Sequence, residues 1–273
     1  MPLRVISASR RIDMVGTAPQ NLSETLRTRF LPSDVHTLVI WTKDPVTLLT
    51  HRDLRSTVSS YGQLFVHFTI TGMGATRLEP RSPPAEEALS ALGPLVELVG
   101  RPERVRVRFD PIVHLVLPSG RTYCNVRHFE RVVRRAGTLG IPSVTVSWME
   151  CYAKVRRRLA SQGISPQPVS AELVREETER MLRECARQGM RLLGCCAEGL
   201  ESSRCIDGEL LSSLHPLGLE CSVAKARGQR TLCRCTASLD IGWYSPCAHG
   251  CLYCYANPKP DVAAEGPVLP EGA

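Results

Sequence analysis

The sequence predicts an α/β fold, a partial (β/α)6 barrel followed by a C-terminal cysteine-rich extension that binds a metal cluster. Two observations predict it. Six short β-branched runs alternate with amphipathic segments, and most of the twelve cysteines lie after the last run. Strands that alternate with helices at this spacing form βαβ units and hence a parallel sheet. We therefore expect an open, six-stranded partial barrel to which a thiol-rich segment is attached.

The expected strands are fairly apolar on both faces, which is typical of parallel sheets. They span residues 3–7, 37–41, 64–70, 104–109, 143–148 and 190–195. The clearest helix covers about 168–187 with Ser170 as its N-cap, a second carries the apolar stripe over 126–136, and a short helix is expected at 207–214. The predicted divisions are the partial barrel (1–195), the cysteine-rich extension (196–257) and a flexible tail (258–273).

Composition and charge narrow the class of protein. The chain has 273 residues of which 43% are hydrophobic, enough for a full core, and its formal charge of +7 favours anionic partners. No secretory signal and no apolar run of membrane-spanning length is evident. We therefore expect a cytoplasmic protein that has no membrane partner. In a reducing compartment, clustered cysteines bind metal or do redox chemistry more often than they form disulfides.

Polar residues follow the ends of the expected strands. In barrels, functional groups collect on the face where strands end and loops begin. Arginine and lysine there grip carboxylates or phosphates, and carboxylates bind ribose hydroxyls or take protons. The same carboxylates are equally compatible with helix capping or arginine pairing, and the basic residues with a solvated loop. The candidates for the catalytic site are Arg10, Asp13, Lys43, Asp110, Glu150 and Glu198.

The spacing of three late cysteines is the strongest functional signal. Cys247, Cys251 and Cys254 form a C-x3-C-x2-C motif. Three thiolates in a tight loop can hold three irons of a cubane and leave the fourth iron open. An open position is typical of a site that activates a bound molecule, whereas a closed structural site uses four protein ligands. The spacing also fits a zinc knuckle formed by Cys233, Cys235 and two of the later cysteines.

This triplet, with Tyr253 before its last cysteine, resembles the cluster motif of radical S-adenosylmethionine enzymes. Across nearly the whole chain, the sequence also resembles an uncharacterised bacterial group, domain-of-unknown-function family 1848. The stretches that carry this second resemblance are residues 6–13, 41–45, 196–198, 240–242 and 247–257. In the radical superfamily the three-cysteine loop usually follows the first strand, whereas here it follows the last. We therefore expect the C-terminal loop to fold back over the barrel mouth.

The resemblance to radical S-adenosylmethionine enzymes implies a reaction class. A reduced [4Fe-4S] cluster would give an electron to S-adenosylmethionine, and the 5′-deoxyadenosyl radical so formed would abstract hydrogen from a substrate. The expected partners are S-adenosylmethionine, an electron donor such as flavodoxin or ferredoxin, and an unidentified substrate for which the basic charge favours an anion. The protein would contribute cluster ligands, a dry cavity and orientation.

Four further thiols are predicted to hold a second, fully ligated iron–sulfur cluster: Cys196, Cys205, Cys233 and Cys235. Four thiolates complete a closed shell. Cys195 is an alternative to Cys196, and only one of the two should reach the site, because adjacent side chains leaving a strand point to opposite faces. Spacing alone fits a structural zinc equally well.

A second hypothesis is a zinc- or iron–sulfur-stabilised nucleic-acid-binding module without radical chemistry. It rests on basic residues that could meet phosphates, although a solvated helix face accounts for them better, because basic stretches without stacking aromatic residues are common. They are Arg131, Arg134, Arg135, Lys154, Arg156, Arg157 and Arg158.

One histidine and four cysteines are expected to have structural roles. His249, inside the three-cysteine loop, is expected to support the cysteines and not to bind the metal itself. Four cysteines fall outside any ligand pattern and are expected to be small buried side chains: Cys124, Cys151, Cys185 and Cys221.

Overall fold

A computed structural model describes residues 3–244, 246–256 and 258, and it is built around a seven-stranded sheet. Every neighbouring pair of strands in this sheet is parallel. In spatial order the strands are β10 (Leu239–Asp240), β1 (Arg4–Ala8), β2 (Val35–Thr42), β3 (Leu64–Thr69), β4 (Val105–Ile112), β7 (Ser143–Trp148) and β9 (Arg191–Gly194). The predicted α/β class is therefore confirmed.

The six predicted strands are all present, and they lie side by side in chain order. The additional strand β10 comes from the cysteine-rich extension. A second, antiparallel sheet has the order β6 (Thr122–Cys124), β5 (His114–Val116) and β8 (Ser165–Pro166). These added strands are only two or three residues long, too short to show an alternating pattern in the sequence.

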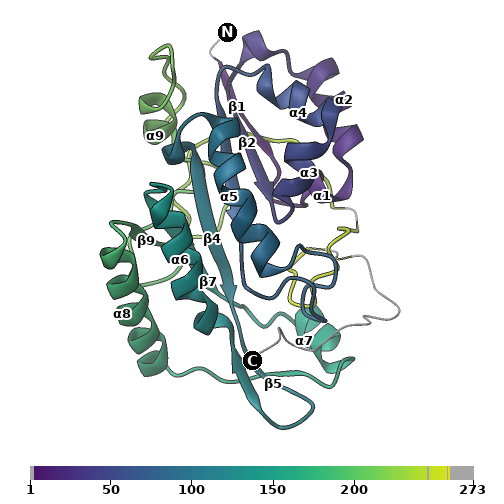
Figure 1. Cartoon of the computed structure of the whole chain (residues 1–273), viewed down its shortest axis with the longest axis vertical. Helices are drawn as coiled ribbons and strands as arrows, with labels where there is room; N and C mark the ends of the chain where they lie inside the picture. The colour runs from purple at the N-terminus through teal and green to yellow at the C-terminus, as the bar shows by residue number, and fades with distance from the viewer. Residues whose placement is uncertain (1–2, 245, 257, 259–273) are drawn as a thin grey trace.

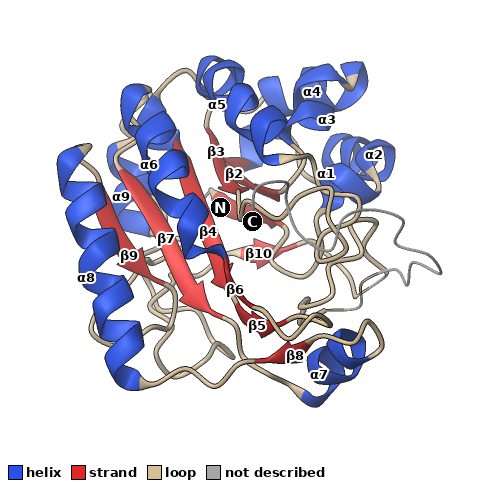
Figure 2. Cartoon of the chain, turned by 60° about the horizontal axis from the view of Figure 1, so that its bottom comes forward, coloured by secondary structure: helices blue, strands red, loops and turns tan. Residues whose placement is uncertain are grey.

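Helices connect the successive strands, and most of them cover one side of the main sheet (Figures 1 and 2). The described helices are α1 (Met14–Thr17), α2 (Pro19–Arg29), α3 (Pro45–Thr50), α4 (Arg52–Ser59), α5 (Ala85–Val99), α6 (Phe129–Thr138), α7 (Ala153–Ala160), α8 (Ala171–Arg187) and α9 (Gly208–Ser213). Helix α7 packs against β8 instead, and α9 lies on the opposite face of the main sheet. Three of the described helices match the predicted helices. The Ser170 hydroxyl accepts from the Leu173 N–H as the N-cap of α8, as predicted, and Asp207 caps α9 in the same way.

The sheet face under the helices is apolar and closely packed. Alternate residues of the strands point to it, among them Ile6, Leu38, Val66, Val107 and Val144. They meet buried side chains of the helices, for example Leu22, Leu92, Val132 and Met181. Full burial of one such side chain stabilises the fold by about 1.5–3 kcal/mol, so this layer is the main source of stability.

The opposite face of the sheet differs from the expectation that both faces are apolar. It combines Val5, Val39 and Phe65 with buried polar side chains, including His67 and Arg108. Residues of the extension cover this face and complete a separate apolar cluster there. The strands therefore alternate between an apolar side under the helices and a mixed side under the extension.

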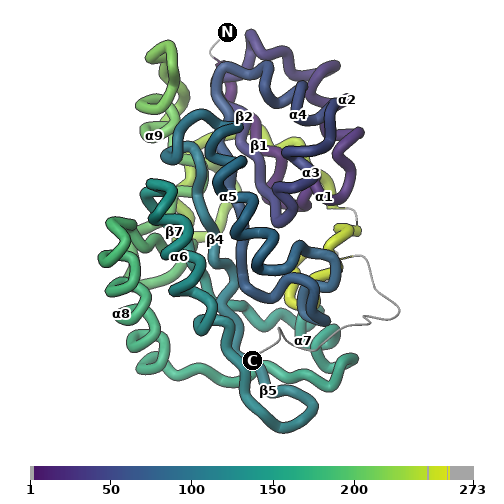
Figure 3. The backbone as a smooth tube through the Cα atoms, in the orientation of Figure 1, coloured from purple at the N-terminus to yellow at the C-terminus, as the bar shows by residue number. Residues whose placement is uncertain are grey.

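The extension is fastened to the first strand of the sheet. Strand β10 pairs in parallel with β1, where Ile6 lies opposite Leu239 and Ser7 opposite Asp240. The Asp240 carboxylate accepts hydrogen bonds from the hydroxyls of Ser7 (3.1 Å) and Ser9 (2.8 Å) and from the Arg10 N–H (3.0 Å). Figure 3 shows the yellow C-terminal part of the tube returning to the purple N-terminal part.

In the part of the chain that the structure describes, no helix is long and apolar enough to cross a membrane. The predicted tail, residues 258–273, lies outside the described residues except for Pro258, which forms a bridge with Cys247.

Replacing Asp240 with Ala should loosen the extension from the sheet. The side chain is 8% exposed, and its loss leaves several buried donors without an acceptor. We expect local opening to become easier by about 3 kcal/mol, or roughly a hundredfold faster amide exchange. Hydrogen–deuterium exchange should show this at residues 9–13 and 239–244, with α8 unchanged. Exposed Asp34→Ala is the control, and equal protection in both variants would contradict the assigned role.

Candidate functional site

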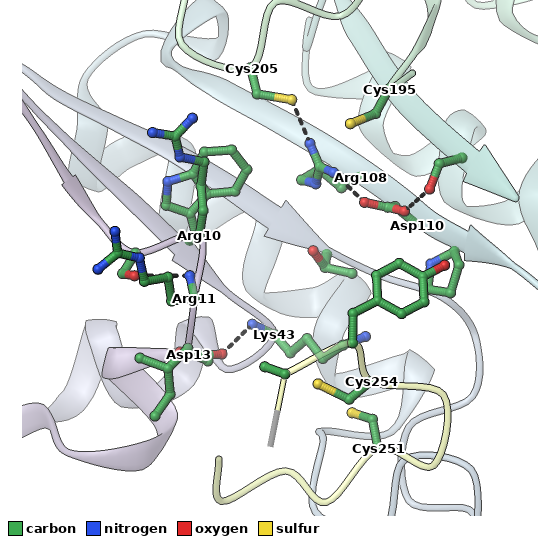
Figure 4. A pocket seen from close by; sticks show the side chains of 18 of the residues that line it. Arg10, Arg11, Asp13, Lys43, Arg108, Asp110, Cys195, Cys205, Cys251 and Cys254 are labelled. Atoms are coloured by element: carbon green, nitrogen blue, oxygen red, sulfur yellow. Dashed lines mark hydrogen bonds and ion pairs between the residues drawn. The ribbon is translucent and has the colours of Figure 1, made fainter. Parts of the chain in front are cut away.

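The carboxyl ends of the six consecutive strands surround a cavity of about 420 Å³. Its wall includes Asp13 after β1, Lys43 after β2, Thr69 of β3, Asp110 of β4 and Ser147 of β7, and Cys195 follows β9. The extension supplies the rest of the wall, so that eight cysteines line the same space: Cys195, Cys196, Cys205, Cys233, Cys235, Cys247, Cys251 and Cys254. The three cysteines of the C-x3-C-x2-C motif and the other five of these cysteines, which precede them in the chain, therefore line one cavity (Figure 4).

The three-cysteine loop places its sulfurs together at one end of this cavity. Cys247 and Cys251 are buried and Cys254 is half-buried. Cys251 interacts electrostatically with both of the others. Burial, together with the nearby Glu79 carboxylate, holds the pKa of the Cys251 thiol well above its usual value. Such a thiol becomes a thiolate only when a cation compensates the charge, which is what a bound metal does.

Contacts to two other segments hold this loop in place. The Leu252 N–H donates to the Leu78 carbonyl at 3.0 Å, and the Arg81 N–H donates to the His249 carbonyl at 3.3 Å. From α7, Arg158 donates to the carbonyls of Leu252 (3.0 Å) and Cys254. These bonds fix the loop by its backbone, and all three cysteines line the cavity, where the Cys247 sulfur accepts a hydrogen bond from the Thr17 hydroxyl at 3.6 Å.

His249 links the loop to the first strand. Its Nε2 lies 2.7 Å from the Asp13 carboxylate and its Nδ1 lies 3.2 Å from the Arg81 carbonyl, so both ring nitrogens are engaged by protein groups. Burial alone would lower the pKa of His249, but Asp13 raises it to about 9. His249 therefore links the three-cysteine loop to the Asp13 carboxylate and to the backbone of Arg81.

Asp13 joins three segments at one carboxylate. It caps α1 by accepting from the Gly16 N–H at 3.0 Å, and it accepts from the Lys43 N–H (2.7 Å) and the Thr42 hydroxyl (3.0 Å) of β2. Like the bond to His249, each of these contacts is made with another group of the protein. Asp13 therefore caps a helix and pairs with a side chain, which is one of the two roles that the sequence left open. It does so at the edge of the cavity.

Lys43 enters the cavity wall as part of a buried polar group. Its ammonium lies 3.1 Å from Glu79, which also accepts hydrogen bonds from Thr71 and from the Tyr253 hydroxyl of the three-cysteine loop. Burial alone would lower the pKa of Lys43, yet Glu79 and Cys251 raise it above its usual value. Burial would raise the pKa of Glu79, and Lys43 lowers it instead. A charged pair thus stands beside Cys251.

The second cysteine group centres on Cys205. Its buried sulfur accepts hydrogen bonds from the thiols of Cys195 and Cys235, and Arg108 donates to it at 2.9 Å. These donors, the thiols first, hold the pKa of Cys205 well below its usual value. Figure 4 shows Cys195 and Cys205 at the opposite side of the cavity from Cys251 and Cys254, with Arg108 and Asp110 lying between.

Cys195 and Cys196 both line the cavity, although only one was expected to reach it. The physical reason is local: Cys196 has a φ of 54°, a left-handed conformation that ends the strand geometry at this point. The expected alternation of side chains therefore stops between them. Cys233 also lines the cavity and interacts with Cys196 and Cys235.

The other candidate residues divide into two groups. Arg10 lines the cavity and forms an ion pair with Asp240 (3.5 Å), and Asp110 lines it while paired with Arg108. Glu150 lies outside the cavity wall and forms an ion pair with Arg230 at 2.8 Å. Glu198 is exposed on a turn and is likewise not part of the wall.

Several residues that contact the site were not among the candidates predicted from the sequence. They are Glu79, Arg108 and Arg230, and none of them belongs to a recognisable motif. Arg108 carried the best available signal, because it and Arg106 are charges inside a largely apolar strand and must find partners when buried. Glu79 is placed by contacts with residues 36 and 174 positions away, which no local pattern reveals.

Comparison with known proteins identifies the family but no activity. No curated protein matches the chain. One family model, described as "Domain of unknown function (DUF1848)", matches residues 5–256. This match includes all seven strands of the main sheet and both cysteine groups of the cavity. The chain therefore belongs to the DUF1848 family.

Proposed function

We propose that this protein is a radical S-adenosylmethionine enzyme whose active-site [4Fe-4S] cluster is held by Cys247, Cys251 and Cys254. The observation that carries the proposal is the position of these three sulfurs. They lie together in a tight loop, next to a cavity lined by the carboxyl ends of parallel strands. The sequential order of the six strands also supports a partial (β/α)6 barrel, to which β10 adds an edge strand.

The residues around the three cysteines suit such a cluster. His249 has no ring nitrogen left for a metal, so the loop offers three ligands and not four. This is the donor set that leaves one iron open for a second molecule. The buried Lys43 favours the thiolate form of Cys251, whereas its partner Glu79 opposes it, so that stabilisation of the thiolates falls mainly to the bound cluster.

When bound, the cluster would supply the electron that cleaves S-adenosylmethionine to a 5′-deoxyadenosyl radical. The protein's own part is to position the reactants and exclude water. Tyr253 and Tyr255 line the cavity beside the loop, and the Tyr253 hydroxyl is held by Glu79. Fixed aromatic walls of this kind keep a reactive intermediate away from solvent.

Guanidinium groups in the cavity wall favour an anionic substrate. Five arginine and lysine residues line the cavity, and each of them is ion-paired with Asp240, Glu79, Asp110 or Glu150. An arginine in such a pair keeps spare N–H donors that can bind a substrate carboxylate or phosphate. The volume of about 420 Å³ lies in the range of small-molecule sites. A flavodoxin or ferredoxin remains the proposed electron donor.

We propose a second cluster at the Cys205 end of the cavity. The five thiols there exceed the four of a closed shell, and Cys195 joins the proposed ligands Cys196, Cys205, Cys233 and Cys235 as a candidate. The Arg108 guanidinium donates a hydrogen bond to the Cys205 sulfur. Hydrogen bonds of this kind tune the reduction potential of an iron–sulfur cluster. A structural zinc is the alternative occupant.

The nucleic-acid-binding hypothesis has less support, because much of its basic surface is already engaged. Arg158 binds carbonyls of the three-cysteine loop, Arg131 pairs with Glu86, and Arg134 pairs with Glu130. Anaerobically purified iron–sulfur protein is brown, whereas a zinc module is colourless, and formation of 5′-deoxyadenosine separates the enzyme from an iron–sulfur-stabilised binding module.

Changing Cys247, Cys251 and Cys254 together to Ala should abolish formation of 5′-deoxyadenosine by reduced, anaerobically reconstituted protein. The reason is that each thiolate is proposed to hold one iron of the open-site cluster. Chromatographic assay of 5′-deoxyadenosine needs no knowledge of the substrate. Cys151→Ala, outside the cavity wall, is the matched control and should keep the wild-type rate. Undiminished product from the triple variant would refute the assignment.

The same triple variant tests the second cluster. We expect about four irons and four sulfides per chain to remain, with a cluster signal in electron paramagnetic resonance. Adding Cys205→Ser should remove them, because Cys205 stands at the centre of the remaining thiols. Comparing Cys195→Ala with Cys196→Ala then shows which neighbour is a ligand. Folded triple variant that holds zinc, or no metal, would rule out a second cluster.

A further inference from the structure

A third group of metal-binding side chains lies outside the cavity. His114 of β5, Cys124 of β6 and Glu177 of α8 bring one ligand atom each within 4.8 Å of one another. His114 and Cys124 face each other across the β5–β6 pair, and α8 packs beside them with Glu177. The sequence assigned Cys124 a purely apolar role, because the three residues are far apart in the chain and form no motif.

The distances within this group match a tetrahedral zinc site. His114 Nε2 lies 3.1 Å from Glu177 Oε2, Cys124 Sγ lies 3.5 Å from the same Nε2, and Cys124 Sγ lies 3.5 Å from the other carboxylate oxygen of Glu177, Oε1. Zinc bonds of about 2.0 Å to nitrogen or oxygen and about 2.3 Å to sulfur, at tetrahedral angles, put nitrogen and oxygen about 3.3 Å apart and sulfur about 3.5 Å from either.

A hydrogen-bonded network accounts for two of the three contacts, because His114 Nε2 can donate to Glu177 Oε2 and the Cys124 thiol can donate to Oε1. It does not account for the approach of Cys124 Sγ to His114 Nε2 at 3.5 Å, because the single N–H of that nitrogen is directed at Glu177. A Cys–His–Glu catalytic relay would use the two ring nitrogens separately. Convergence of three ligand atoms from different residues on one point is instead the geometry of a shared cation.

The surroundings of the group also suit a divalent cation. His114 is 6% exposed, and Cys124 and Glu177 are half-buried, so the site lies at the edge of the buried interior. A thiolate and a carboxylate together neutralise two positive charges, which removes the cost of burying a net charge. The Trp148 indole N–H donates to Glu177 at 3.3 Å, an orienting hydrogen bond of the kind that metal-ligating carboxylates receive.

We propose that His114, Cys124 and Glu177 bind one Zn²⁺ independently of the iron–sulfur clusters, with a water as the fourth ligand. Mixed sulfur, nitrogen and oxygen donors favour zinc over magnesium or calcium. The ion would tie the small sheet to α8. Its binding does not depend on the radical chemistry proposed for the cavity.

Zinc content and zinc X-ray absorption of full-length protein test this proposal. Cluster-loaded protein is exposed to zinc, dialysed and analysed for metals. We expect about one zinc per chain, with one sulfur and three nitrogen or oxygen neighbours. Cys124→Ser and Glu177→Gln should each reduce zinc content at least about tenfold without loss of iron. Buried Cys185→Ala and exposed Glu176→Gln, both on α8, should retain the zinc.

The spectrum separates this site from the other thiols. Zinc coordinated mainly by sulfur and retained in Cys124→Ser would place the ion among the cavity cysteines and overturn the proposal. Wild-type protein that takes up no zinc would overturn it as well. Circular dichroism and cluster absorption identify variants that fold, and Glu177→Gln, which preserves side-chain shape, provides the test if Cys124→Ser does not fold.

Discussion

The parallel pairing of β10 with β1 is the constraint on which the cavity depends. The three-cysteine loop follows the last strands of the chain, yet it must lie at the carboxyl ends of the first two. Two residue pairs between β10 and β1, together with the Asp240 carboxylate, bring the chain back to these strands. They hold the extension beside Ser7 and Ser9. From there the loop reaches Asp13 through His249 and Glu79 through Tyr253. Each of these contacts joins segments more than 170 positions apart.

The extension and the sheet also satisfy each other's polar groups. Arg106 and Arg108 stand on strand β4 and would be costly to bury without partners. The extension supplies those partners, since the carbonyls of Ser203 and Arg204 accept from Arg106 and Cys205 accepts from Arg108. A sheet with these arginines cannot be covered by a simple apolar layer. The cysteine-rich segment is therefore part of the core and not an addition to its surface.

The sequence predicted those parts of the fold that depend on local periodicity. All six long strands were identified, as was α8 with its cap, because each contains enough residues for the pattern to repeat. Strand β10 has two residues and no pattern of its own. The C-x3-C-x2-C motif was visible because its ligands are neighbours in the chain. Glu79 and the His114, Cys124 and Glu177 group were not, because only tertiary folding brings these residues together.

The position of the three-cysteine loop sets an order of events during synthesis. The six strands from β1 to β9 of the main sheet leave the ribosome before residues 247–254 do, so this part of the sheet and its helical layer can form while the loop is still being translated. A cluster of the kind proposed for this loop would therefore be inserted late, into a scaffold that already exists. Until then, the thiols of the cavity would be open to oxidants. Cells that make this protein in air would need to deliver iron and sulfide soon after the chain is finished.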